Sequence, residues 1–256
     1  MTVMEGLVLG LGVVSLVGLV VLVRRRAKTR VGLWGGLDVL IAFCAMFIGA
    51  GLATMLLMKV LHGTWGVEET PPLEIVMVGT FVGSLSSAVV AWVSAGWSGI
   101  GLDSVDAKWY GWAVLALLLF LLFGLGWSTL VEHWFGIMEE QALLAEIRDE
   151  ATGLWRFAFV FYGVICAPLL EEILFRGFLL PALDRAVGAW LSILISAFVF
   201  GLFHVQDPQA VLPIVVLGTC LAWLRLKSGS IWPGVCMHSA NNAIAIGTIM
   251  LVPAFI

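Results

Sequence analysis

The 256-residue chain is 61% hydrophobic and only 12% charged, with a formal net charge of −4 at pH 7. A soluble domain of this length carries roughly twice that charged fraction, so a soluble globular protein is excluded. Nucleic-acid binding is not indicated, because the only basic run, from Arg24 to Arg30, directly follows an apolar stretch. The composition predicts a protein embedded in the lipid bilayer.

Eight apolar stretches are long enough to cross a bilayer as helices. The first, Met4–Val23, precedes the basic run, which is the reverse of the order in a signal peptide, so we expect a retained helix. The others are 37–59, 73–95, 109–131, 154–183, 189–206, 209–226 and 231–252. We therefore predict an all-α polytopic membrane protein with eight transmembrane helices, forming one membrane domain over residues 1–256.

The distribution of charge predicts the orientation. The basic run places loop 24–36 in the cytoplasm and the N-terminus outside. With eight helices, most cations of the other loops also fall inside, whereas the outward loops hold Glu68, Glu69, Glu139, Glu140, Glu146, Asp149 and Glu150. A short multi-pass chain of this kind is typical of the bacterial inner membrane. Segment 132–152, on the outer side, fits either an interfacial helix or a solvated loop.

Ionisable groups are distributed unevenly between the two halves. Such groups inside a bilayer cost several kcal/mol each, so they persist mainly where they pair, face a cavity or perform chemistry. The first four helices, residues 1–131, contain almost none. The last four, residues 154–252, contain Glu171, Glu172, Arg176, His204, His238 and Asn242. We expect the functional site in this C-terminal part.

The fifth helix contains two adjacent glutamates. Neighbouring residues on a helix point about 100° apart, so Glu171 and Glu172 face different directions. Arg176 lies four residues after Glu172, the spacing of an intrahelical ion pair. Glu172 is thus expected to be neutralised by Arg176, which leaves Glu171 as a candidate general base.

The sixth and eighth helices add polar groups at one-turn spacing. Phe200 and His204 share one face of the sixth helix, and His238 and Asn242 share one face of the eighth. At ~1.5 Å per residue, Glu171, His204 and the His238–Asn242 pair lie roughly 20, 22 and 10–17 Å from the cytoplasmic helix ends. These depths are compatible with one cluster near the middle of the membrane.

The residue types suggest hydrolysis by activated water. Glu171 and His204 could hold and deprotonate a water that attacks a peptide carbonyl, while His238 and Asn242 could stabilise the resulting oxyanion. Covalent catalysis ranks low, since no serine or cysteine has an obvious base partner except Cys236 and Ser239, which flank His238. No cofactor is required, although Glu171, His204 and His238 could form an open zinc site as an alternative.

These motifs resemble the CAAX prenyl endopeptidase and bacteriocin-processing family, also called CPBP or Abi. The resemblance covers Tyr162 to Asn242 through Glu171-Glu172-x-x-x-Arg176, Phe200-x-x-x-His204 and His238-x-x-x-Asn242. It implies an intramembrane glutamic endopeptidase with the roles given above, in which Glu172 and Arg176 support the helix. Its expected partner is a membrane-associated protein or peptide, and myxosortase-like processing of exported proteins is one option.

Two other functions remain open at this stage. A proton-coupled transporter could use Glu171 and the histidines as a relay, although the inverted repeats common in transporters are not visible. A catalytically inactive immunity or scaffold protein could also retain the polar core, with His238 and Asn242 serving only to hold helices together.

Overall fold

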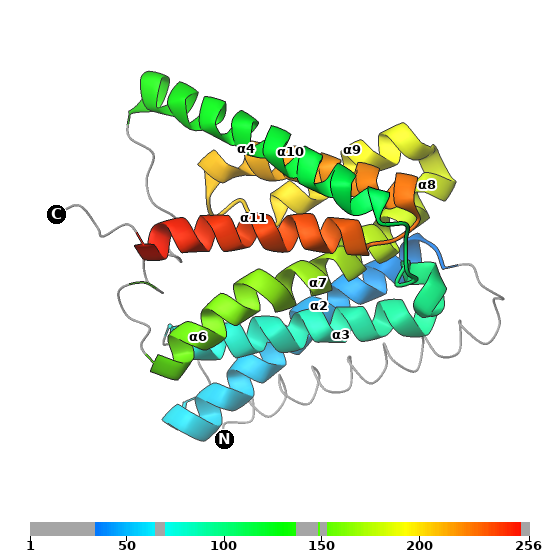
Figure 1. Ribbon diagram of the computed structural model, residues 1–256. Coiled ribbons are helices and arrows are strands. Elements are labelled where there is room, and N and C mark those ends of the chain that lie inside the picture. The colour runs from blue at the N-terminus through cyan, green and yellow to red at the C-terminus, as the bar shows by residue number, and fades with distance from the viewer. Residues whose placement is uncertain (1–33, 65–69, 137–147, 149–152, 252–256) are drawn as a thin grey trace. The chain divides into compact units, whose positions relative to one another are not determined.

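The computed structural model describes residues 34–64, 70–136, 148 and 153–251. Within these residues the protein is all-helical, with seven helices when the continuous helix over 153–187 is counted once, and no strand (Figure 1). The predicted all-α class is therefore confirmed for this part of the chain. The expected helix Met4–Val23 and most of segment 132–152 lie outside the described residues.

Five of the helices are long and apolar enough to cross a membrane: Gly36–His62, Leu73–Ile100, Lys108–Trp134, Gly153–Val187 and Pro208–Ser228. The helix α9 (Ala189–Leu202) is apolar but has 14 residues. At ~1.5 Å per residue it is about 21 Å long, shorter than a hydrocarbon core of ~30 Å. The helix α11 (Trp232–Leu251) has 20 residues and is long enough to cross a membrane. Its polar side chains make it less apolar than the five helices named above. The protein is a multi-span membrane protein, while the eight-helix topology and its orientation stay predictions.

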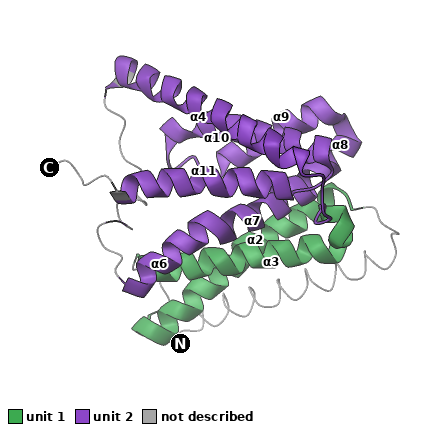
Figure 2. Ribbon diagram, viewed as in Figure 1, with its two compact units in different colours: residues 1–100 green, residues 101–256 purple. Residues whose placement is uncertain are grey.

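The chain divides into two compact units, residues 1–100 and 101–256 (Figure 2). In the first unit, α2 (Gly36–His62) and α3 (Leu73–Ile100) pack along each other. A side chain at Gly83 would overlap the Met46 carbonyl oxygen, and one at Gly79 would overlap Thr54. Because small residues let helix backbones approach closely, these glycines define the α2–α3 contact.

The second unit contains α4 (Lys108–Phe135), the continuous helix over 153–187, α9, α10 (Pro208–Ser228) and α11. The helix α10 packs against α4, α9 and α11. An apolar core fills the space between α10, α4 and α11, and its fully buried members include Leu221, Leu224 and Met237. This packing places the polar residues of α11 near those of the continuous helix.

The continuous helix contains two π-helical segments. It runs through α6 (Gly153–Phe161), η1 (Tyr162–Cys166), α7 (Ala167–Glu172), η2 (Ile173–Leu179) and α8 (Leu180–Val187). The wider turn of a π-helix shifts the side chains that follow it relative to a regular α-helix, and such segments are frequent at functional sites. Glu171 and Glu172 lie between the two, at the end of α7.

The start of α11 is fixed by contacts to the loop that precedes α4. Ile231 N–H donates to the Gly101 carbonyl at 2.9 Å, and the Trp232 indole donates to the Leu102 carbonyl at 3.0 Å. The Ser230 hydroxyl donates to the Asp103 carbonyl at 2.9 Å. Two turns further along α11 comes His238, so this loop contact sets the position from which that side chain projects.

Candidate active site

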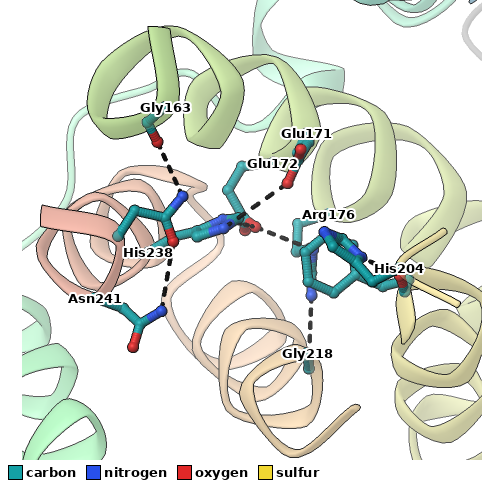
Figure 3. A network of polar contacts seen from close by, with 10 residues as sticks. Gly163, Glu171, Glu172, Arg176, His204, Gly218, His238 and Asn241 are labelled. Atoms are coloured by element: carbon teal, nitrogen blue, oxygen red, sulfur yellow. Dashed lines mark hydrogen bonds and ion pairs between the residues drawn. The ribbon is translucent and has the colours of Figure 1, made fainter. Parts of the chain in front are cut away.

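A buried ion pair forms the centre of a polar network in the second unit (Figure 3). Arg176 Nη1 lies 3.0 Å from Glu172 Oε1, and both side chains are completely buried. The contact predicted from the four-residue spacing is therefore present. Because a buried charge without a partner is very unfavourable, each of these groups depends on the other.

Arg176 is also held by groups from α9 and α10. Its Nη2 donates to the Gly218 carbonyl at 3.2 Å, and its guanidinium lies 4.3 Å from the centre of the Phe200 ring. A cation over an aromatic face is attracted by the ring quadrupole. A Cβ at Gly218 would lie 3.2 Å from Arg176 Nη2 and 3.1 Å from the Ala197 backbone, so the close approach of these helices depends on this glycine.

The imidazole of His238 lies between the two glutamates. Its Nδ1 is 3.4 Å from Glu172 Oε1, a long hydrogen bond, and its Nε2 is 3.7 Å from Glu171 Oε2, beyond hydrogen-bond distance but close enough for attraction between charges. The two glutamates thus approach opposite nitrogens of one ring. Glu171, Glu172, His238 and Arg176 form a continuous chain of contacts across three elements of the second unit (Figure 3).

The two glutamates differ in access. The side chain of Glu171 is 30% exposed, whereas that of Glu172 is 0% exposed. A Cβ at Gly234 would come within 2.9 Å of Glu172 Oε2, so α11 covers Glu172 closely where Gly234 faces it. Within the network, Glu171 is therefore the carboxylate that a water or a substrate can reach.

His204 joins the site through an aromatic ring rather than through Glu171. The predicted helix over 189–206 ends earlier, at Leu202, because the chain turns before Asp207 and Pro208, which begin α10. His204 lies in that turn, where its Nδ1 contacts the Phe200 carbonyl at 3.0 Å. The Phe200 ring packs edge-on against His204 at 5.1 Å and against His238 at 5.7 Å. Among the described contacts, none joins Glu171 to His204 directly.

Asn242 holds α11 against the first π-helical segment. Its Nδ2 donates to the Gly163 carbonyl at 2.9 Å, and Asn241 Nδ2 donates to Asn242 Oδ1 at 3.4 Å. A side-chain amide has two N–H donors, so the bond to Gly163 leaves one N–H of Asn242 for another acceptor. The interhelical contact that the sequence left open as an alternative is therefore present at Asn242, which lies one turn beyond His238 on α11.

Three glycines and a phenylalanine shape the site although the sequence did not single them out as functional. Gly163 supplies the carbonyl for Asn242, Gly218 approaches Arg176, and Gly234 faces Glu172. Phe175 packs edge-on against Phe200 at 5.0 Å. Gly234 precedes His238 by four residues, a spacing that could have indicated a shared face. Nothing local marks Gly163 or Gly218.

No three His, Cys, Asp or Glu side chains of the described residues are grouped as a metal site requires. The four cysteines, Cys44, Cys166, Cys220 and Cys236, form no disulfide with one another. The zinc alternative predicts that a chelator abolishes cleavage.

A buried glutamate–histidine–arginine network among helices that are long and apolar enough to cross a membrane defines a candidate site in a membrane protein, and sequence comparison shows what the segment around it is similar to. Residues 153–244 match the family model described as type II CAAX prenyl endopeptidase Rce1-like. This segment contains all six predicted site residues. Over these residues the chain is similar to this family of membrane peptidases, which confirms the resemblance seen in the motifs.

A relative of known sequence agrees with this assignment. The chain is 28% identical over 136 residues to the "Putative membrane peptidase YdiL" of Bacillus subtilis (strain 168). The match covers 53% of this chain and 54% of that protein, so it spans about half of each. No solved structure matches the chain.

Proposed function

We propose that this protein is an intramembrane endopeptidase that cleaves a membrane-associated protein or peptide with Glu171 as general base. The single observation that carries the proposal is the contact chain from the partly exposed Glu171 through His238 to the buried Glu172–Arg176 pair. A network of this kind holds charged groups in a low-dielectric site and leaves one carboxylate open, as a water-activating base requires.

Charge balance permits the assignment of protons that this proposal needs. With Glu171 and Glu172 ionised, and with Arg176 and His238 protonated, the four groups sum to zero charge. A neutral cluster is the arrangement that costs least inside a bilayer. His238 would then donate to Glu172 through Nδ1 and present a second N–H at Nε2 beside Glu171.

The proposed reaction proceeds by attack of water on a peptide carbonyl. Glu171 accepts a proton from the water while the water oxygen bonds to the carbonyl carbon. His204 helps to orient that water. The negative charge that forms on the carbonyl oxygen is stabilised by N–H groups of His238 and Asn242. The C–N bond then breaks, and the proton held by Glu171 passes to the leaving nitrogen. Glu172 and Arg176 position His238 and do not touch the substrate.

The test uses the full chain in proteoliposomes with candidate membrane substrates. Glu171→Gln, Glu171→Ala and His204→Ala are compared with the wild type, and Glu132→Gln, which neutralises an exposed glutamate on α4, is the matched control. We expect cleavage to fall about 10²- to 10⁴-fold in the Glu171 variants and to be retained in the control. Cleavage that persists in all three site variants would rule out this mechanism. Loss of cleavage with a chelator, restored by zinc, would instead support the metal-dependent alternative.

A further inference from the structure

His204 has two described side-chain contacts, and both are with Phe200. Its Nδ1 lies 3.0 Å from the Phe200 carbonyl oxygen, and its ring packs against the Phe200 ring with the centroids 5.1 Å apart and the planes at 66°. The proposed mechanism uses His204 to orient the attacking water but gives Phe200 no part. The way in which Phe200 holds the imidazole therefore determines what His204 can offer to that water.

The carbonyl of Phe200 is open to the His204 side chain because α9 ends at Leu202. In a continuous helix this oxygen would accept the backbone N–H of His204, four residues later. Here that N–H donates to the Gly201 carbonyl at 2.9 Å instead. The last carbonyls of a helix lack regular partners, and the Phe200 oxygen accepts the Phe203 N–H at 3.3 Å. Its second lone pair accepts from the imidazole.

This contact fixes which nitrogen of His204 carries the proton. A carbonyl oxygen can only accept a hydrogen bond, so Nδ1 must be the donor. In a neutral imidazole the other nitrogen, Nε2, then has no hydrogen and can only accept. A water molecule has two O–H donors, and Nε2 of His204 is an acceptor for one of them.

The Phe200 ring is itself held on several sides, and only 1% of the residue is exposed. The Arg176 guanidinium lies over the ring at 4.3 Å, the Phe175 ring packs edge-on at 5.0 Å, and the His238 ring approaches at 5.7 Å. A ring enclosed in this way cannot turn without displacing its neighbours. It therefore sets the plane of the His204 imidazole and connects that imidazole to the buried Arg176.

We propose that Phe200 is a positioning residue for the peptidase reaction, which holds His204 as the Nδ1–H tautomer and leaves Nε2 to accept a hydrogen bond from the attacking water. This role rests on the proposed function, and it specifies how that water is held. One O–H of the water donates to Glu171 and the other to His204 Nε2, so a lone pair of the water oxygen is left for the carbonyl carbon. Glu171 takes the first proton as the new C–O bond forms, while the second proton stays on the oxygen.

The tautomer can be measured by ¹⁵N NMR of the full chain in detergent micelles, with its four histidines labelled. The His204 signals are assigned by their loss in His204→Gln, and spectra are recorded in mildly alkaline buffer so that the ring is neutral. For the wild type we expect a protonated Nδ1 and an unprotonated Nε2. In Phe200→Leu, which keeps the carbonyl but removes the ring, we expect both tautomers to be populated. A wild-type His204 with its proton on Nε2, or a Phe200→Leu spectrum identical to that of the wild type, would overturn the proposal.

Peptide cleavage in proteoliposomes supplies a second readout, which loss of packing alone would not move. Phe200→Leu should lower kcat by about 10²-fold and leave KM within about twofold, because a misplaced group weakens the transition state more than it weakens substrate binding. The matched control is Phe120→Leu, which removes a buried ring from the apolar core between α4, α10 and α11. The unfolding temperature of both variants is measured alongside. A fall in kcat no larger than that of the control would show that Phe200 has a structural role only.

The NMR measurement separates this role from the proposed function, since the Nδ1–H tautomer is also expected in Glu171→Gln. Cleavage by a wild type whose His204 carries its proton on Nε2 would overturn the role of Phe200 and leave the proposed function standing. If Glu171→Gln cleaved as fast as the wild type while His204 kept the Nδ1–H tautomer, the proposed function would fail and the hold of Phe200 on His204 would stand.

Discussion

The two compact units hold their helices together in different ways. In the first unit, α2 and α3 meet where Gly79 and Gly83 allow backbones to approach. In the second unit, the motif-bearing helices are joined by buried charges and hydrogen bonds around Arg176 and His238. Close packing of small residues is an inexpensive way to join helices in lipid, whereas buried charges are costly and are retained where they serve a function. The difference agrees with our proposal that the second unit carries the chemistry.

The largest effect on stability is expected from removing the buried cation. Arg176→Met leaves Glu172 without its partner, and breaking a buried pair in this way typically costs 3–5 kcal/mol. The double variant Glu172→Met/Arg176→Met should recover most of that loss, since no uncompensated charge remains. The measurement is the free energy of unfolding in detergent micelles. A single variant as stable as the wild type would show that the pair is not buried as described.

A smaller loss is expected where the first unit is packed most closely. Gly83→Ala places a methyl group against the Met46 carbonyl oxygen, which as backbone cannot move aside, so we expect destabilisation of about 1–3 kcal/mol. Gly51→Ala is the matched control on α2, because a side chain there meets nothing within 4 Å and alanine favours the helix. The measurement is the thermal unfolding temperature of each of the two variants. Equal stability would contradict the role given to close backbone approach.

Breaking the Asn242–Gly163 hydrogen bond should have a modest effect on stability and a larger one on activity. Interhelical hydrogen bonds in membranes average ~0.6 kcal/mol, so Asn242→Ala should lower stability by about that amount. If Asn242 also stabilises the oxyanion, cleavage should fall by ~10²-fold or more. Thr248→Ala is the control on the same helix, because it removes an exposed hydroxyl that donates to the Ile244 carbonyl of α11. A loss of activity no greater than the loss of folded protein would leave Asn242 with a structural role only.

The smallest effect concerns the start of α4, outside the membrane-spanning segments. The Lys108 backbone N–H donates to Asp106 at 3.0 Å and lowers the pKa of that carboxyl, with help from the Lys108 side chain. A lowered pKa in the folded state contributes stability above the ordinary pKa, and this is lost as the pH falls through the folded value. The wild type should therefore be slightly more stable than Asp106→Asn at neutral pH, and this difference in stability should disappear between about pH 5 and pH 3. Thermal unfolding across that range measures it, and an advantage that grows on acidification would contradict the assignment.

The sequence predicted local relations better than relations between helices. Glu172 and Arg176 form the pair that their spacing indicated, since that contact depends only on the turn of one helix. Glu171 and His204 were expected to hold one water between them, which stays a prediction, while the described contact of Glu171 is with His238. Hydropathy does not reveal the two π-helical segments, which change the direction of the side chains that follow them. It also does not reveal that the helix ends at Leu202, so that His204 lies in a turn. Residue types indicated the candidate site, while the contacts within it required the structure.

The contact between Glu171 and His238 is tested most directly by a double-mutant cycle on peptide cleavage. The cycle compares Glu171→Gln, His238→Asn and the double variant in proteoliposomes, with folding of each confirmed by its unfolding temperature. Residues that act as one unit are strongly non-additive, so the double variant should lose little more activity than the more severe single variant. Independent losses that multiply in the double variant would show that the two side chains do not work together.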